Sequence, residues 1–224
     1  MVEKRYKHGL QLQGAYTWSK SFDWASSFEE TMNPFNFRAS RALSLFDSRH
    51  RFVLSYYWDI PTGKHNGALG KVVNGWAVSG ISSFQSGFPI RLQTQDDTEL
   101  ITSVMFAGTA APSLNGPLTF LNPKKNGNYW FDRTNFSDPP PGQFGNLRRT
   151  VCCGPGTNNT DLAVHKKTNI SETKYIQFRA EFFNLFNHTQ FFNPDGNFSD
   201  GSNFGRITRA RDPRLIQFGL KFYY

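Results

Sequence analysis

The sequence has no long apolar run, which excludes one way of crossing a membrane. No stretch of its 224 residues approaches the roughly 18 consecutive apolar residues of a membrane-spanning helix. The first residues, Met1 to Tyr6, also lack the apolar core of a secretory signal peptide. The chain is therefore either cytoplasmic or cut from a longer one. We expect the second, because the strand pattern described below opens in the middle of an architecture.

Cysteine is also scarce, and this argues against a site that depends on it. Cys152 and Cys153 are adjacent, which gives neither a disulfide framework nor a four-ligand zinc site. They form either a vicinal disulfide in a loop or two free thiols. The 5 histidines are dispersed, and Asp96, Asp97 and Glu99 lack the ligand order of a Ca²⁺ loop. With no Gly-rich phosphate loop either, we expect no catalytic, cofactor or metal site.

Aliphatic residues are few, whereas aromatic residues are abundant. Hydrophobic residues make up 38% of the chain, yet aromatics reach 16% and include 23 Phe. This balance suits a sheet with one apolar and one polar face, because strands favour aromatic and β-branched residues. The net charge of +8 comes from Lys and Arg that are scattered along the chain. A nucleic-acid partner is therefore not expected.

Apolar and polar residues alternate with a period of two in several runs, which indicates strands. In the first run Leu10 and Leu12 fall on one face, opposite Gln11 and Gln13. The runs cover residues 9–20, 49–60, 75–92, 161–170, 175–186 and 214–224. The connections 61–74 and 171–174 are short, whereas 21–48, 93–160 and 187–213 are long and rich in Asn, Asp, Gly, Pro and Ser.

Long and short connections alternate, so up-and-down topology places all long loops at one end of the sheet. Bacterial outer-membrane barrels show this asymmetry, with long extracellular loops and short periplasmic turns. The runs also match the roughly 9–11 residues that cross a membrane at a tilt. We therefore predict an all-β fold, an antiparallel up-and-down transmembrane β-barrel segment of about six C-terminal strands. Six strands cannot close such a barrel, so we expect an open curved sheet.

The barrel prediction assigns both faces of the strands. Aromatic residues near strand ends are expected in the two interfacial belts, namely Tyr16, Trp18, Phe52, Trp58 and Trp76. The polar face is expected to line the lumen as a solvated or plug-facing wall, with Gln11, Gln13, Arg51, Asp59, Gln177, Arg179 and Glu181.

Several segments resemble the β-barrel of TonB-dependent outer-membrane transporters of the Oar-like group, which carry an N-terminal carboxypeptidase-regulatory-like domain. The resemblance runs in order along nearly the whole chain, through residues 15–20, 47–53, 85–89, 178–188, 204–208 and 212–214. It implies that residues 1–224 are the C-terminal part of a barrel of roughly 22 strands. The plug, the TonB box and the regulatory-like domain are not seen in these residues.

The last eight residues resemble the β-signal that the barrel assembly machinery reads. Gln217, Gly219, Phe222 and Tyr224 fill the polar, glycine and two aromatic positions of that signal. The resemblance implies a Gram-negative cell outer membrane as the location and contact with its lipid. It also implies uptake of an unidentified ligand, driven by TonB through the absent N-terminal region, and no enzyme activity.

Two other functions remain open at this point. An outer-membrane adhesin or structural barrel without transport shares every feature above, and the upstream coding region would discriminate it by the absence of a plug and TonB box. A secreted β-sandwich that binds glycans through Trp and Tyr is the third hypothesis. It would fold without detergent.

Overall fold

The main body of the protein is one antiparallel sheet. The structure, a computed structural model, describes residues 1–27, 33, 35–63, 65–94 and 110–224, so Asp96, Asp97 and Glu99 lie outside the described residues. The sheet has seven strands in the order β1-β2-β5-β6-β11-β12-β13. These strands are β1 (Val2–Lys7), β2 (Leu10–Trp18), β5 (His50–Asp59), β6 (Trp76–Gln85), β11 (Thr157–Asn169), β12 (Tyr175–Phe183) and β13 (Leu215–Tyr223).

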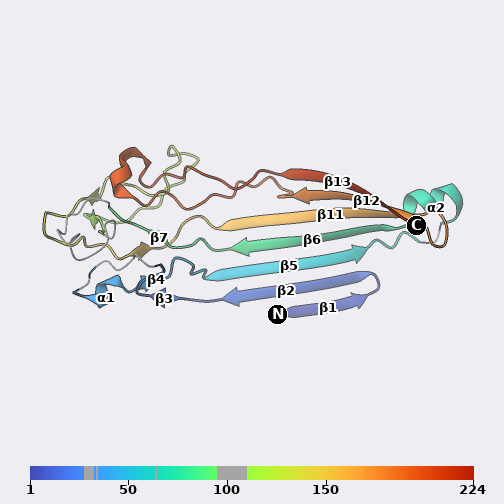
Figure 1. Ribbon diagram of the computed structural model, residues 1–224, viewed down its shortest axis with the longest axis horizontal. Coiled ribbons are helices and arrows are strands. Elements are labelled where there is room, and N and C mark those ends of the chain that lie inside the picture. Colours follow the sequence, from blue (N-terminus) through green and yellow to red (C-terminus); the bar gives the residue numbers. More distant parts are fainter. Residues whose placement is uncertain (28–32, 34, 64, 95–109) are drawn as a thin grey trace.

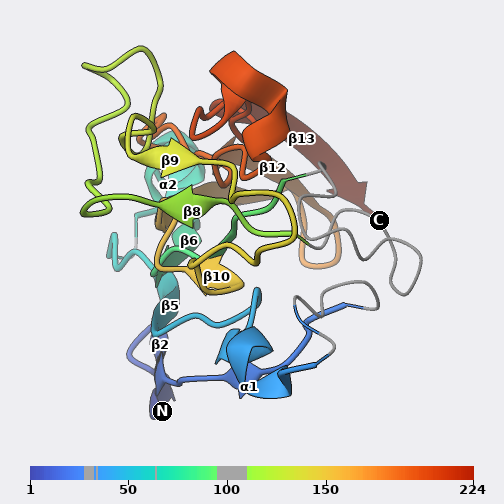
Figure 2. The ribbon, with the colours of Figure 1, turned by 90° about the vertical axis from the view of Figure 1, so that its left-hand side faces the viewer.

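The connections divide between the two ends of the sheet. The turn from β1 to β2, the segment from β5 to β6 and the turn from β11 to β12 lie at the end where the chain terminates (Figure 1). The three long connections lie together at the opposite end, where Figure 2 shows them in front of the curved sheet. Within the described residues β1 and β13 are each paired on one side only. The predicted open, antiparallel, up-and-down sheet is thus confirmed.

Some strand boundaries differ from the prediction, and each difference has a local cause. The sequence does not predict β1, because Glu3 and Lys4 break its alternation, yet it pairs with β2 through the backbone. The run predicted to reach residue 92 ends at Gln85, because the chain leaves the sheet at Gly87. A Cβ on Gly87 would lie 1.8 Å from the carbonyl oxygen of Gly154, so only glycine permits this approach. Strand β11 begins at Thr157, within a polar stretch that does not alternate.

The predicted turn region 61–74 contains a short helix, α2 (Gly67–Val73), which the sequence does not predict. Its C-terminal neighbour Asn74 closes the helix, with its backbone N–H donating to the Gly70 carbonyl. The indole N–H of Trp76 donates to the Val72 carbonyl at 2.9 Å. No helix of the described residues is long and apolar enough to span a membrane.

The described parts of the long connections pack into a folded unit at one end of the sheet, here called the cap (the described residues within 19–49, 86–156 and 184–214). Its core consists of Ile90, Leu92, Phe131, Phe136 and Phe204, all buried. The rings of Phe131, Phe136 and Phe204 lie with centroids 5.0 to 5.5 Å apart. Its small elements are β3 (Phe22–Asp23), α1 (Phe37–Ser40), β4 (Ala42–Leu43), β7 (Ile90–Arg91), β8 (Ser113–Leu114), β9 (Phe136–Ser137), β10 (Thr150–Val151) and a 3₁₀ helix (Phe198–Asn203).

One buried arginine joins two of the cap loops. The Arg149 side chain is 1% exposed and forms an ion pair with the carboxylate of Asp23. Its Nε donates to the Ser40 carbonyl at 3.2 Å, and the adjacent Thr150 hydroxyl donates to the Leu43 carbonyl at 2.8 Å. A buried guanidinium is tolerated because these acceptors compensate its loss of water. The two loops are therefore held in one fixed arrangement.

The adjacent cysteines lie in the cap, where the structure joins them as a vicinal disulfide, one of the two alternatives left by the sequence. The indole N–H of Trp130 donates to the Cys153 carbonyl at 2.9 Å, tying this segment to the aromatic core.

Candidate functional site on the polar face of the sheet

The strand register gathers polar side chains into rows across one face of the sheet. Residues paired on neighbouring strands share a face. Gln11 pairs with Tyr57 and Tyr57 with Ser79, and β11 connects Ser79 to Glu181, which pairs with Gln217. These residues form one row. The next row contains Asp59, His165, Arg179 and Gly219. The predicted polar residues all lie on this face, namely Gln11, Gln13, Arg51, Asp59, Gln177, Arg179 and Glu181.

His165 is the centre of a hydrogen-bond network on this face. It is 9% exposed and lies between Ser79 on β6 and Arg179 on β12. The Arg179 Nε–H donates to His165 Nδ1 at 3.2 Å, while His165 Nε2 lies 2.9 Å from the Ser79 hydroxyl. Arg179 also contacts Glu181 at 3.8 Å. Since an arginine N–H can only donate, the imidazole must be neutral with its proton on Nε2.

A prediction follows for the tautomer of His165. NMR of the imidazole nitrogens of the folded protein is expected to show a protonated Nε2 and an unprotonated Nδ1. Arg179→Met removes the donor to Nδ1, so the two tautomers should mix and stability should fall by about 1 kcal/mol. Lys221→Met, a change on the same face at a residue that pairs with Gln177 on β12, is the matched control. An unchanged tautomer in Arg179→Met would refute this assignment.

A second cluster of hydroxyls surrounds Asp59. The Tyr57 hydroxyl donates to Asp59 Oδ1 at 2.8 Å, and the Tyr6 hydroxyl on β1 donates to Oδ2. The Tyr57 ring lies with its centroid 6.5 Å from that of His165, which joins the two clusters. Polar side chains from β1, β5, β6, β11 and β12 thus form one connected surface.

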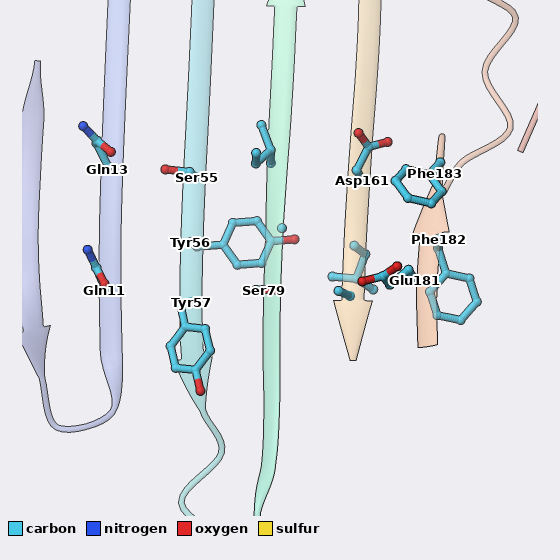
Figure 3. A pocket seen from close by; sticks show the side chains of 14 residues that line it. Gln11, Gln13, Ser55, Tyr56, Tyr57, Ser79, Asp161, Glu181, Phe182 and Phe183 are labelled. Carbon is cyan, nitrogen blue, oxygen red and sulfur yellow. The ribbon is translucent and has the colours of Figure 1, made fainter. Parts of the chain in front are cut away.

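Two cavities lie along this face. The first, of about 460 Å³, is surrounded by Gln11, Gln13, Ser55, Tyr57 and Glu181, among others (Figure 3). The second, of about 720 Å³, lies where the sheet meets the cap and is lined by polar groups that include Gln190 and Arg211. Asp161 and Phe183 line both cavities. The polar face therefore continues from mid-sheet to the underside of the cap.

The opposite face is apolar. Leu12, Tyr56, Gly80 and Leu162 form one of its rows, and the Tyr56 ring lies across Gly80, where it fills the space that a side chain would take (Figure 3). Of the predicted belt residues, Tyr16, Trp18 and Phe52 lie at the cap end of the strands. Trp58 and Trp76 lie at the other end. Their place in a lipid interface stays a prediction.

The four predicted signal residues divide between the faces of β13. Gln217 and Gly219 pair with Glu181 and Arg179 on the polar face. Phe222 lies on the apolar face, 54% exposed, and its ring stacks on that of Tyr224 with centroids 6.1 Å apart. Recognition of these residues by an assembly machine stays a prediction.

Sequence reasoning missed Tyr6, Tyr57, Ser79 and His165. The alternation already contained a signal for Tyr57, which lies between Ser55 and Asp59 on the same face. His165 likewise alternates with Leu162 and Val164, but its approach to Arg179 depends on the register of two strands. Among the described residues, no group of three His, Cys, Asp or Glu side chains is placed to hold a metal ion.

The segment that follows β12 makes the transition from the sheet to the cap. Asn184 and Asn187 adopt positive φ angles of 51° and 50°, a conformation that asparagine tolerates. The Asn184 N–H donates to Asp161 Oδ1 at 2.8 Å, and its side chain both donates to and accepts from the His188 backbone. Asn187 Oδ1 accepts from the Arg214 N–H at 3.0 Å. Asp161 and Asn184 also line the second cavity.

Two cap carboxylates are expected to respond to pH in opposite directions. Burial raises the pKa of Asp195, as do a hydrogen bond with Asp200 and the charge of Asp200, while the Asn197 N–H acts against the rise. Backbone and side-chain hydrogen bonds from Thr134 lower the pKa of Asp132. The folded state thus favours protonated Asp195 and ionised Asp132.

The local stability of the segments around Asp195 and Asp132 should depend on pH as these two pKa shifts require. The stabilisation that Asp195 gives the folded state is present at low pH and is lost as the pH rises through its raised pKa. That of Asp132 is present above the ordinary aspartate pKa and is lost as the pH falls through its lowered pKa. Hydrogen exchange, corrected for its intrinsic pH dependence, should show both trends. Asp195→Asn should remove the pH dependence of amide protection around residue 195, and Asp132→Asn should remove that around residue 132. Protection that changes with pH in the same direction in both segments would contradict this prediction.

The comparison with protein families gives one match. The model of a family described as outer membrane beta barrel domain matches residues 1–217. The match spans β1 to β12 and the start of β13. No curated protein and no solved structure matches the chain.

Proposed function

This chain belongs to the family of outer membrane β-barrel domains, and on that premise we propose that it forms the wall of a TonB-dependent transporter that takes up a ligand. As a barrel segment of the outer membrane, its sheet has one face toward lipid and one toward the lumen. The apolar face is the lipid side and the polar face the lumen side. A soluble glycan-binding sandwich is thereby excluded.

One observation carries the transport proposal. The cavity over the middle of the polar face and the cavity beneath the cap share Asp161 and Phe183. A polar lumen face is common to outer-membrane barrels, but two cavities that join into one path from the cap to the middle of the strands favour passage of a ligand. A ligand that passes through the lumen would meet hydrogen-bonding groups along this whole path, including Gln11, Ser79, His165 and Glu181.

The resemblance to Oar-like transporters supports the same proposal and supplies its partners. Most segments of that resemblance lie at the cap ends of the strands, and two of them meet where the Ser86 N–H donates to the His50 carbonyl at 2.9 Å. Strands beyond β1 and β13 would complete the barrel, because unpaired strand edges in lipid cost several kcal/mol per group. The plug and the TonB-binding region belong to the N-terminal part of this proposed transporter. The barrel assembly machinery inserts it.

The test uses the full-length gene product in its own outer membrane. A photo-crosslinker in the region upstream of residue 1 should yield an adduct with TonB, and deletion of the TonB-contacting segment should abolish the adduct. Heat-modifiable migration on gels checks in parallel that the barrel has formed. A folded barrel without any TonB adduct would refute transport and favour the adhesin or structural barrel.

A further inference from the structure

A second candidate binding site lies on the cap, away from the polar face of the sheet. A cavity of about 600 Å³ opens between α1 and the segment 145–148. Trp24, Arg38, Arg41 and Arg148 contribute to its lining. This volume falls in the range of small-molecule sites, roughly 300–1,000 Å³.

Two contacts hold the walls of this cavity. The Asp23–Arg149 ion pair lies directly beside Trp24 and Arg148 in the sequence, and it joins the two loops that form the cavity. The Arg41 guanidinium lies 4.9 Å from the centroid of the Phe22 ring, which fixes its direction. A site built on such a frame loses little conformational freedom when a ligand binds.

The described lining of this cavity carries positive charge from Arg38, Arg41 and Arg148. Arg38 and Arg148 are exposed, and no ion pair involves either of them within the part of the chain that the structure describes. Among the residues that the structure describes, no acidic residue contributes to the lining. By contrast Arg149, one residue further along, is paired with Asp23. Within the described residues the cavity therefore presents the guanidinium groups of Arg38 and Arg148 without a carboxylate partner.

Trp24 adds a second, different binding element. Its side chain is 54% exposed although it lines the cavity. A planar indole offers an apolar face against which a ring can pack, and guanidinium groups match a carboxylate with paired N–H donors. We propose that this cavity binds carboxylated sugars, with the ring on Trp24 and the carboxylate on Arg38 and Arg148. This goes beyond the proposed transport and holds whether or not TonB acts on the protein.

Trigalacturonic acid is the probe, titrated calorimetrically into the full-length barrel purified in detergent. Arg38→Gln with Arg148→Gln should weaken binding about tenfold or more, because each arginine donates charge-assisted hydrogen bonds. Lys124→Gln with Lys125→Gln removes the same charge from an exposed turn of the cap and is the matched control. Trp24→Ala should also weaken binding, and hydrogen exchange of the cap amides shows whether each variant folds.

Two further probes test the carboxylate and the sugar ring separately. Maltotriose, which has no carboxylate, and inorganic pyrophosphate, which has no sugar ring, should each bind at least about tenfold more weakly. Competition by lipopolysaccharide tells whether acidic sugars of the membrane surface occupy the same cavity as free ones. Absence of trigalacturonate binding would overturn the proposal, as would equal losses in the two double variants. Binding of maltotriose or pyrophosphate as tight as that of trigalacturonate would overturn it too.

Discussion

Replacing Phe222 and Tyr224 together by alanine is expected to lower the amount of assembled barrel in the outer membrane about tenfold or more, equivalent to roughly 1.4 kcal/mol in binding of the terminal strand. Phe222, near the end of β13, and Tyr224, just beyond it, are 54% and 93% exposed. They are therefore accessible to an assembly machine. Heat-modifiable migration of the full-length protein in membrane fractions measures the effect.

The same strand offers a matched control for this experiment. Phe218 and Leu220 lie on the same face as Phe222, are 67% and 71% exposed, and occupy variable positions of the signal. Phe218→Ala with Leu220→Ala removes comparable apolar surface from the lipid face and should leave assembly nearly unchanged. If both double variants assemble equally poorly, general loss of lipid contact explains the effect and the signal assignment is wrong.

Phe131→Ala is expected to destabilise the cap by about 3–5 kcal/mol, the usual cost of emptying a buried aromatic site. Phe131 is 0% exposed, and its ring centroid lies 5.5 Å from that of Phe136 and 5.2 Å from that of Phe204. Gly205 packs closely against the same ring, so the site cannot collapse easily. Hydrogen exchange of cap amides in the intact barrel measures the effect separately from the strands.

Phe120 provides the control for the cap. Its side chain is 42% exposed and contacts Trp130 at the edge of the core. Phe120→Ala should therefore cost about 1 kcal/mol or less, as for other partly exposed positions. Equal loss of protection in the two variants would show that the cap has no cooperative core around Phe131. Strand amides in β5 and β6 should keep their protection in both variants.

The strands with strong alternation could be predicted from the sequence, and the weaker ones could not. Leu10 to Trp18 and Tyr175 to Phe183 alternate clearly, so their faces are assigned correctly. Strand β1 and the start of β11 at Thr157 consist mostly of polar residues. They become strands because a neighbouring strand supplies hydrogen-bonding partners, which a local pattern does not reveal.

The candidate sites show the same division. Alternation places Asp59, Arg179 and Glu181 on the polar face, because side-chain direction in a strand depends only on the residue's parity. The contacts of His165 with Ser79 and Arg179 require the register of three strands. In the cap, Arg149 meets Asp23 across 126 residues of sequence. Nothing in either loop alone indicates this meeting.

The sequence by itself determined the all-β class, the two faces of the sheet and the end at which the long connections lie. These follow from period two and from loop length, which are properties of neighbouring residues. The tertiary structure alone decided the row-by-row partners on the polar face, the aromatic core of the cap and the arginine-lined cavity beside Trp24. These depend on contacts between distant segments, whose energies are set by packing and register rather than by any local pattern.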